Sequence, residues 1–291
     1  MRDDFCIFIL SYKRADNMYT IDSLERANYT GQYYIVLGND DPTIDDYIEK
    51  FGKDKIIIFD KEEQAKLTDT CDNFDKRKVI LYARNFCFDA AKKLGYKYFL
   101  QLDDDYVNFR YRYELNGQFR TTYVREFDEI VDYMIEFLDA SNASTVAFGQ
   151  SGDYIGGKDS SLAKAKIKRK AMNSFFCTTE RPFKFIGSVN EDVNTYCSLG
   201  SEGNLFMTIT DISLDQKRTQ TNQGGMTDEY LDNGTYLKSF YSVISNPSFV
   251  KIFGMDTTHT RLHHRIEWNN AVPKIISGKY KKKKDNPQLA G

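Results

Sequence analysis

Cysteine and proline are scarce in this sequence, and each shortage excludes a class of protein. The 291 residues include five cysteines, an odd number, scattered without Cys-x-x-Cys spacing. A disulfide framework or a structural zinc site is therefore not expected, and a reducing compartment fits the pattern. Only five prolines occur, so long Pro-rich linkers are excluded as well.

Long hydrophobic runs are also missing. No apolar run approaches the ~20 residues that a membrane-spanning helix needs, so we expect no membrane partner. Asp3 and Asp4 stand where the basic start of a signal peptide would be expected. These features predict a cytoplasmic protein.

The chain as a whole has no large excess of charge, since its formal net charge is −2. The charge is nevertheless uneven. Segment 158–170 carries six basic residues and one acid, and Lys279 and Lys281–Lys284 follow near the C-terminus. Such patches bind nucleic acid or other anionic surfaces. A solvated basic helix with a solvated tail is the alternative interpretation.

The apolar pattern of the first hundred residues predicts an α/β fold. Short apolar runs, expected to be strands, alternate with helical patterns at 18–27, 43–51 and 76–94; the runs are 5–10, 33–37, 55–59 and 98–102. Run 5–10 is continuously apolar, as in a strand buried on both faces of a parallel sheet. We therefore expect a Rossmann-like, mainly parallel central sheet with helices on both faces.

The second half of the chain predicts a mixed arrangement. Helices are expected at 124–138 and after residue 188, and strands at 145–148, 175–177, 205–212 and 249–253. The Gly-rich stretch 149–157 and the polar stretch 216–227 are expected to be loops.

Polar breaks follow three of the predicted parallel strands, at 11–17, 38–42 and 103–105. In sheets of this kind ligands bind beyond the carboxyl ends of the strands, so these breaks should lie together. Asp103, Asp104 and Asp105 repel one another and call for a cation, typically a divalent metal held by oxygen ligands. A solvated acidic turn is the alternative.

All three histidines of the chain fall within residues 259–264. Imidazole is a common metal ligand, so His263 or His264 could join Asp103 and Asp105 at a metal. In an extended segment the two histidines point to opposite sides, and only one of them would bind. Histidines that make hydrogen bonds on a C-terminal surface are the alternative.

Several of these segments together resemble the nucleotide-sugar-binding half of a GT-A glycosyltransferase; they are Ser11-Tyr12-Lys13-Arg14, Gly38-Asn39-Asp40-Asp41, Ala83-Arg84-Asn85 and Leu102-Asp103-Asp104-Asp105. The resemblance implies a nucleoside-diphosphate sugar as donor, a UDP-sugar above others, and Mn²⁺ or Mg²⁺ as cofactor. It also implies a single domain, 1–280, with a donor half, 1–106, an acceptor half, 107–280, and a flexible basic tail, 281–291.

The resemblance also assigns roles to single residues. Asp105 would be the main metal ligand, and Asp103 would contact the ribose or the metal. The donor-binding set would be completed by Ser11, Tyr12, Lys13, Arg14, Asp40, Arg84 and Asp104. Strand alternation would place Asp103 and Asp105 on one face and Asp104 on the other, where Asp104 would support the site. An exposed helical pair is the alternative for Arg84 and Asn85.

Transfer with inversion needs a carboxylate that deprotonates the acceptor hydroxyl. In inverting GT-A enzymes this base lies in an acidic motif downstream of the D-x-D. The resemblance therefore implies Asp192 as the base, with Glu191 as the second choice. If the reaction retains configuration, Asp192 would bind sugar or acceptor hydroxyls instead. A Glu-Asp pair that merely starts a helix is the alternative.

The second half resembles the phage-type DNA-modifying glycosyltransferases that are associated with oxidised methylpyrimidines. The resemblance rests on the run 261–275, the basic segment and the lysine tail. It implies DNA as partner and 5-hydroxymethylpyrimidine as acceptor, with the base flipped into the pocket. If a phage encodes the chain, the cytoplasm in which it acts would be that of the host. A polysaccharide, lipid or protein acceptor, and a non-catalytic nucleic-acid-binding protein on the same scaffold, are the alternatives.

Overall fold

The computed structural model describes residues 1–72, 79–150, 153, 169–217, 237–255 and 261–273. The strands are β1 (Phe5–Leu10), β2 (Gln32–Gly38), β3 (Ile56–Phe59), β4 (Tyr98–Asp103), β5 (Tyr106–Leu115), β6 (Gln118–Tyr123), β7 (Thr145–Gln150), β8 (Ser174–Thr178), β9 (Phe206–Gln216), β10 (Val250–Met255) and β11 (Arg261–Ile266). The helices are α1 (Tyr19–Arg26), α2 (Ile44–Phe51), α3 (Lys61–Lys66), α4 (Leu81–Leu94), α5 (Phe127–Ser141), α7 (Glu191–Ser201) and α9 (Leu237–Ser245), with 3-10 turns η1 (Ala15–Asn17) and η2 (Lys53–Lys55).

In this part of the chain, nine strands form one mixed sheet in the order β3-β2-β1-β4-β8-β7-β9-β5-β6. Strands β3, β2, β1 and β4 are mutually parallel. Beyond them, β8 is antiparallel to both of its neighbours, and β5 is antiparallel to β9 and β6. Strands β10 and β11 form a separate antiparallel hairpin. The predicted α/β class, with a parallel first half and a mixed second half, is confirmed.

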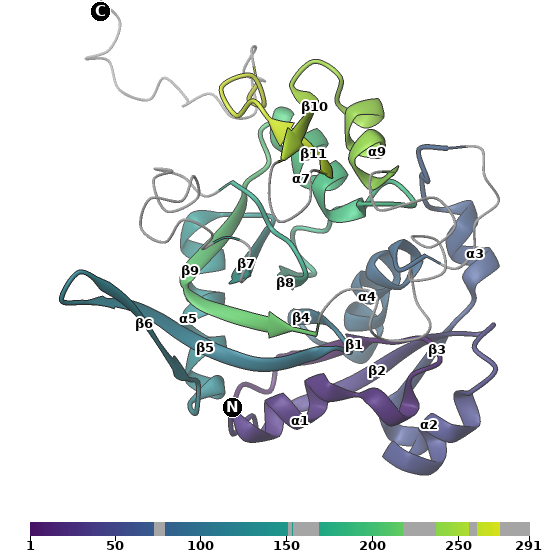
Figure 1. The fold of residues 1–291 in the computed structure, drawn as a ribbon. Helices are drawn as coiled ribbons and strands as arrows, with labels where there is room; N and C mark the ends of the chain where they lie inside the picture. The colour runs from purple at the N-terminus through teal and green to yellow at the C-terminus, as the bar shows by residue number, and fades with distance from the viewer. Residues whose placement is uncertain (73–78, 151–152, 154–168, 218–236, 256–260, 274–291) are drawn as a thin grey trace, which may run out of the picture.

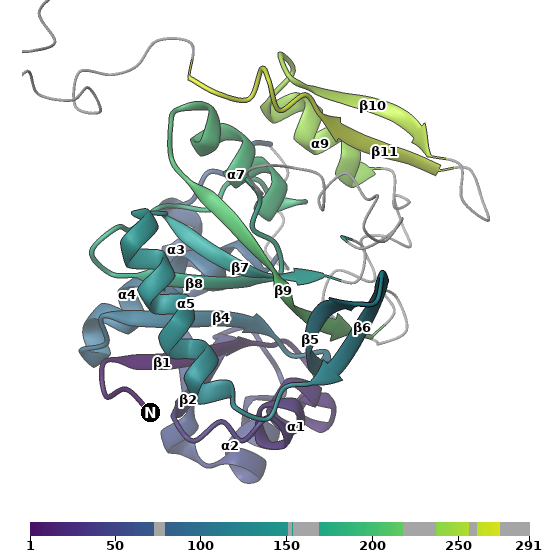
Figure 2. The same cartoon turned by 90° about the vertical axis from the view of Figure 1, so that its left-hand side faces the viewer.

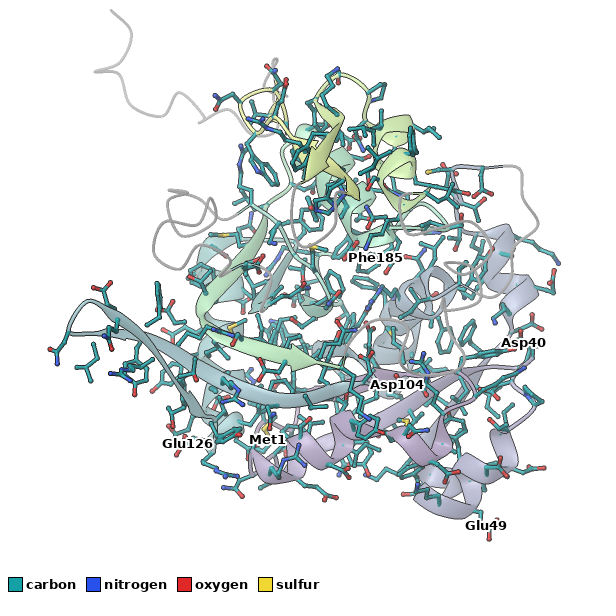
Figure 3. The ribbon with its side chains drawn as sticks, in the orientation of Figure 1. Met1, Asp40, Glu49, Asp104, Glu126 and Phe185 are labelled. Atoms are coloured by element: carbon teal, nitrogen blue, oxygen red, sulfur yellow. The ribbon has the colours of Figure 1, made fainter. Side chains whose placement is uncertain are left out.

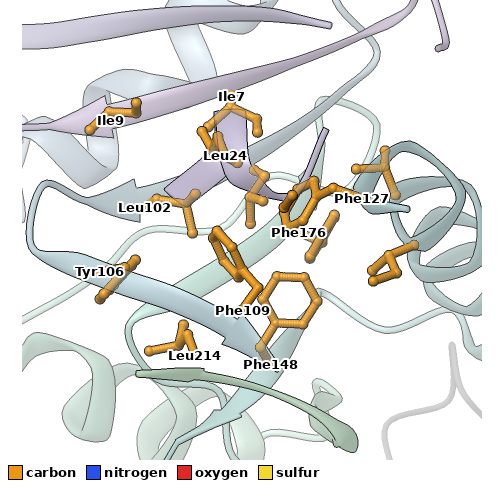
Figure 4. Close-up of a cluster of buried hydrophobic side chains, with 14 of the residues drawn as sticks. Ile7, Ile9, Leu24, Leu102, Tyr106, Phe109, Phe127, Phe148, Phe176 and Leu214 are labelled. Carbon is orange, nitrogen blue, oxygen red and sulfur yellow. The ribbon is translucent and has the colours of Figure 1, made fainter. Parts of the chain in front are cut away.

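The sheet is covered on both faces, which explains the continuous apolar run of β1. Its odd-numbered residues pack into one core with α1, α2 and α5, and its even-numbered residues pack into a second core with α4 and α7. Figure 4 shows part of the first core, where aromatic rings from β5, α5 and β7 meet. Figures 1 and 2 show α4 and α5 on opposite faces of the sheet.

The sequence did not predict the β5–β6 hairpin, strand β11, or helices α3 and α9. The hairpin turns at Asn116 and Gly117, both with positive φ (53° and 75°), which is typical of an Asn-Gly type I′ turn. Helix α3 begins after Asp60, whose side chain accepts a hydrogen bond from the backbone of Glu63, as in a capping box. Both signals are present in the sequence. Helix α4 begins at Leu81 rather than in the predicted stretch from 76, of which 76–78 lie outside the described residues.

None of the described helices has the length and apolar character that crossing a membrane requires.

One threonine holds the turn that carries the acidic cluster. The buried Thr20 of α1 donates its hydroxyl to the backbone carbonyl of Asp103 at 2.6 Å and accepts the backbone N–H of Tyr106 at 3.0 Å. The Thr20 backbone N–H donates to the Asp104 carbonyl at 3.1 Å. These bonds fix the connection between β4 and β5 to α1.

We expect Thr20→Val to lower the free energy of unfolding by about 1–3 kcal/mol, because it leaves a buried carbonyl and a buried N–H without partners. Chemical denaturation measures this change. Thr30→Val is the matched control, since Thr30 is exposed and its hydroxyl bonds the half-buried Asp128, and we expect it to cost about 0.5 kcal/mol or less. Equal costs for the two variants would contradict the role given to Thr20.

Candidate active site

The three adjacent aspartates do not continue the strand. Strand β4 ends at Asp103, and Asp104 and Asp105 form a turn into β5. The expectation that strand alternation places Asp103 and Asp105 on one face is therefore wrong. Each carboxylate instead meets a different set of partners.

Asp104 is buried beneath the site. Its carboxylate accepts the Ser11 hydroxyl at 2.6 Å and forms an ion pair with Arg14 at 2.9 Å. Burial raises the pKa of Asp104, while the charge of Arg14 opposes that shift. Asp104 therefore ties the end of β4 to the segment that follows β1 (Figure 3). These contacts fit the supporting role expected for Asp104.

Tyr47 of α2 completes this connection, although the sequence did not single it out. Its buried hydroxyl lies 2.7 Å from the hydroxyl of Ser11 and accepts the backbone N–H of Arg14 at 2.8 Å. A tyrosine on an amphipathic helix is normally assigned to the core, and only the fold reveals where its hydroxyl points.

Arg84 of α4 joins two acidic segments that are far apart in the sequence. Its guanidinium lies 2.9 Å from the Asp103 carboxylate and 2.8 Å from that of Glu191, at the start of α7. Only 2% of Arg84 is exposed, so the alternative of an exposed helical residue is wrong. Burial alone would lower the pKa of Arg84, but the charges of Asp103 and Glu191 hold it above its ordinary value.

Further contacts fix the position of Arg84. The guanidinium carbon stands 4.8 Å from the ring centre of Phe175 on β8. The Gln101 side chain donates to the Arg84 carbonyl at 3.0 Å. The next residue, Asn85, is also buried and bonds the backbone of Phe185 through both ends of its amide. Phe185 lies above Asp104 in Figure 3, on the side of the C-terminal helices.

Asp105 carries a carboxylate that no cation in the described part of the chain contacts as an ion pair. The Gln216 amide donates to both of its oxygens, at 3.0 and 3.1 Å. Burial and then the charges of Asp103 and Asp104 raise the pKa of Asp105 to about 7. The site therefore holds negative charge that is not neutralised locally.

Asp192 follows Glu191 at the start of α7 and is buried. Its Oδ1 accepts the backbone N–H of Val193 at 2.7 Å. Burial, and then the neighbouring Glu191 charge, raise the pKa of Asp192 to about 7, while Arg84 and Lys238 act in the opposite direction. A carboxyl group tuned to this range can take a proton near neutral pH.

The segments after β1 and β2 lie beside each other. The backbone N–H of Lys13 donates to the buried Asp41 at 2.8 Å. Asp40 is bound by Lys61 of α3 at 2.7 Å, and the Lys61 ammonium stands 5.0 Å from the ring centre of Tyr12. Lys61, which the sequence did not single out, therefore forms an ion pair with Asp40, the carboxylate that was expected to face the donor base.

His263 and His264 lie on β11, paired with Phe253 and Ile252 of β10. The described residues contain no group of three His, Cys, Asp or Glu side chains arranged to hold a metal, so the expected site that combines a histidine with the aspartates is not assembled. Burial and then the charges of His263, Lys238 and Lys170 lower the pKa of His264 to about 3. Figure 1 shows this hairpin stacked on α9, away from the end of β4.

Much of the basic surface predicted from the sequence lies outside the described residues, namely 158–168 and the lysine tail. His259, the third histidine of the predicted cluster, also lies outside them. The two described members of the basic segment make internal contacts. Arg169 donates to the carbonyls of Trp268 and Ala271 at 2.7 and 3.3 Å, and Lys170 pairs with Asp153.

The chain matches the model of the family described as TET-Associated Glycosyltransferase over residues 5–225. This chain belongs to that family. No curated protein matches its sequence. The match includes the acidic turn, Arg84 and the start of α7, so all three belong to the part shared with a family of glycosyltransferases.

Solved structures of similar fold were also found. One is a mannosyltransferase from Pyrobaculum calidifontis in complex with GDP-Man and Mn²⁺, with 11% identity and a TM-score of 0.48 over 84% of this chain; this chain spans 63% of that protein. Another is glucosyl-3-phosphoglycerate synthase from Mycobacterium tuberculosis with Mg²⁺ and uridine-diphosphate, with 9% identity and a TM-score of 0.47 over 93% of this chain and 88% of that one.

We expect Asp192→Asn to stabilise the protein more at pH 8 than at pH 5. A carboxyl with a pKa near 7 when folded and about 3.9 when unfolded binds more protons in the folded state between these values, so stability falls as the pH rises through them. Asparagine does not titrate, so the variant does not lose stability through this group as the pH rises.

Thermal midpoints at the two pH values test this, with an expected extra gain of at least about 2 °C at pH 8. Asp16→Asn is the control because the Asp16 side chain is 95% exposed, and it should shift both midpoints equally. The same shift at both pH values for Asp192→Asn would rule out a raised pKa.

Proposed function

We propose that this glycosyltransferase moves a sugar from a nucleoside-diphosphate donor to a hydroxyl acceptor in a metal-dependent reaction. The observation that carries the proposal is the pair of ion contacts of Arg84, at 2.9 Å to Asp103 and 2.8 Å to Glu191. They hold the acidic turn beside the Glu191-Asp192 pair, as donor activation and acceptor deprotonation in one site require.

The acidic turn fits a divalent metal. Asp105 offers oxygen ligands only, which Mn²⁺ and Mg²⁺ accept, and its raised pKa reflects negative charge that a cation would neutralise. Asp103 already binds Arg84, so we assign Asp105 as the main metal ligand and Asp103 as a contact of the ribose or the metal. A bound metal would act as a Lewis acid that stabilises the leaving diphosphate.

The donor lies, in this proposal, along the carboxyl ends of β1, β2 and β4. Ser11 and Arg14 hold Asp104 in place, and Tyr12 and Lys13 are the neighbouring residues that would surround the nucleotide. Asp40 would face the base together with its partner Lys61. A UDP-sugar is the donor we favour.

Asp192 is the proposed base. Its carboxyl would accept the proton of the acceptor hydroxyl as the oxygen attacks the sugar, and a pKa of about 7 suits this task at neutral pH. Arg84 and Glu191 are then positioning residues. The ion pair between them fixes the start of α7, and with it the neighbouring Asp192.

The preferred acceptor is 5-hydroxymethylpyrimidine in DNA. Two features support this choice: the family description associates these transferases with TET, and the second half of the chain resembles transferases associated with oxidised methylpyrimidines. A hydroxyl of a polysaccharide, lipid or protein is the alternative within the same chemistry. A non-catalytic nucleic-acid-binding role is disfavoured, because binding alone does not require a buried carboxyl tuned to neutral pH beside an acidic turn.

A screen of nucleotide sugars against plain and hydroxymethylated DNA, read by intact mass, tests this proposal. With Mn²⁺ or Mg²⁺ present, we expect one donor to add a hexose or pentose to the hydroxymethylated strand alone. Asp105→Ala should reduce that transfer by at least about 100-fold, as expected for the loss of a metal that contributes several kcal/mol to the transition state.

Glu114→Ala is the matched control, because this carboxylate lies at the exposed end of β5, and it should retain full transfer. Equal activity in Asp105→Ala and the unmodified chain would refute the metal assignment. Transfer to another class of acceptor, with both DNA substrates unchanged, would refute the DNA assignment and leave the donor site intact.

A further inference from the structure

Strand β6 is the outer edge of the nine-stranded sheet. All six of its residues, Gln118–Tyr123, are exposed. Figure 1 shows the β5–β6 hairpin extending away from the body of the molecule. Strand β5 pairs with β9 as far as Tyr111, so beyond that residue the arm is two-stranded in the described structure. A two-stranded ribbon is only marginally stable in water, and we therefore expect this part of the arm to bind a partner.

The free edge of β6 lacks the features that normally prevent strand pairing. Edges are usually protected by lysine, proline, inward-pointing charges or bulges. Strand β6 contains no lysine, proline or acid, and Arg120 is its one charged residue. Its pairing with β5 runs through six residue pairs without a register shift. Among the described residues, no backbone hydrogen bond from Gln118–Thr122 to any strand other than β5 is found.

The same arm exposes large apolar side chains. Tyr113, Leu115, Phe119 and Tyr123 are each between 42% and 52% exposed. The register of the hairpin places Tyr113 and Leu115 on one face and Phe119 and Tyr123 on the other. Each face of the arm therefore exposes two large apolar side chains.

We propose that β6 pairs antiparallel with β6 of a second copy of this chain, with Thr121 opposite Thr121 of the second copy. A twofold axis perpendicular to the sheet makes residues of the same face oppose each other. Near the middle of β6, the axis can therefore pass through Arg120 or Thr121.

Charge decides between these two registers. An axis through Arg120 would oppose two arginines, which is unfavourable. An axis through Thr121 places Arg120 opposite Thr122 and sets Phe119 opposite Tyr123, twice by symmetry. Aromatic pairs and threonine pairs of this kind stabilise antiparallel strands, so β6 is self-complementary in the second register.

Nucleic acid is a weaker candidate for this arm. Arg110 and Arg112 both lie near Asp215, which offsets one of their two positive charges. The tip, residues 113–123, carries one positive residue, Arg120, and one negative residue, Glu114. Binding to a phosphate backbone needs an excess of positive charge, which the tip lacks.

Two neighbouring substitutions test the register directly. Thr121→Glu would set two carboxylates opposite each other, and we expect it to weaken self-association by at least about tenfold. Thr122→Glu would set each new carboxylate opposite Arg120 of the second copy, and we expect it to preserve or tighten the dimer. Sedimentation equilibrium of the full chain over a range of concentrations measures both, and it requires no donor or acceptor.

A mixture of two oppositely charged variants tests whether the variants are folded. Thr121→Glu and Thr121→Lys should each be largely monomeric, and an equimolar mixture should recover the dimer because the two new charges then attract. A chain that is monomeric at all concentrations, or equal weakening by Thr121→Glu and Thr122→Glu, would overturn the proposal. Monomers whose affinity for plain DNA falls equally in both glutamate variants would identify the arm as a nucleic-acid contact instead.

Discussion

The buried ion contacts of Arg84 are the constraint on which the rest of the candidate site depends. A guanidinium that is 2% exposed can remain inside the protein only if carboxylates compensate it, and here two do so, from the end of β4 and the start of α7. The single positive charge of Arg84 is shared between Asp103 and Glu191, and the contacts orient both carboxylates. The residues left with unbalanced charge are Asp105 and Asp192, the two for which proton or metal chemistry is proposed.

The acidic turn shows how one short segment can serve two purposes. Asp104 is directed inward to Ser11 and Arg14, where it ties β4 to β1. Asp105 is directed to Gln216 of β9 and keeps a pKa of about 7. Thr20 holds the backbone on either side of them, at Asp103 and Tyr106. A change of backbone direction at a single turn thus separates the structural contacts of Asp104 from the carboxylate of Asp105, for which a metal-binding role is proposed.

The sequence predicted most of the first half of the fold, because strands buried on both faces have continuous apolar runs and Gly95 ends α4 in a left-handed conformation. It also identified Asp103, Arg84 and Glu191 separately, but nothing local to each residue reports that they meet. The face of Asp105 was predicted wrongly, because a turn replaces the strand at that point. Lys61 and Gln216 were missed, since their importance comes from the carboxylates that the fold brings to them.

The most direct test of this account is the unfolding free energy and transfer activity of Arg84→Gln, measured beside Arg2→Gln. Arg2 pairs with Asp4 on the surface and serves as the matched control. We predict that Arg84→Gln costs about 3–5 kcal/mol, because two buried carboxylates lose their cation, and that transfer is abolished in the fraction that folds. A cost no larger than that of Arg2→Gln, with transfer retained, would contradict the central role of Arg84.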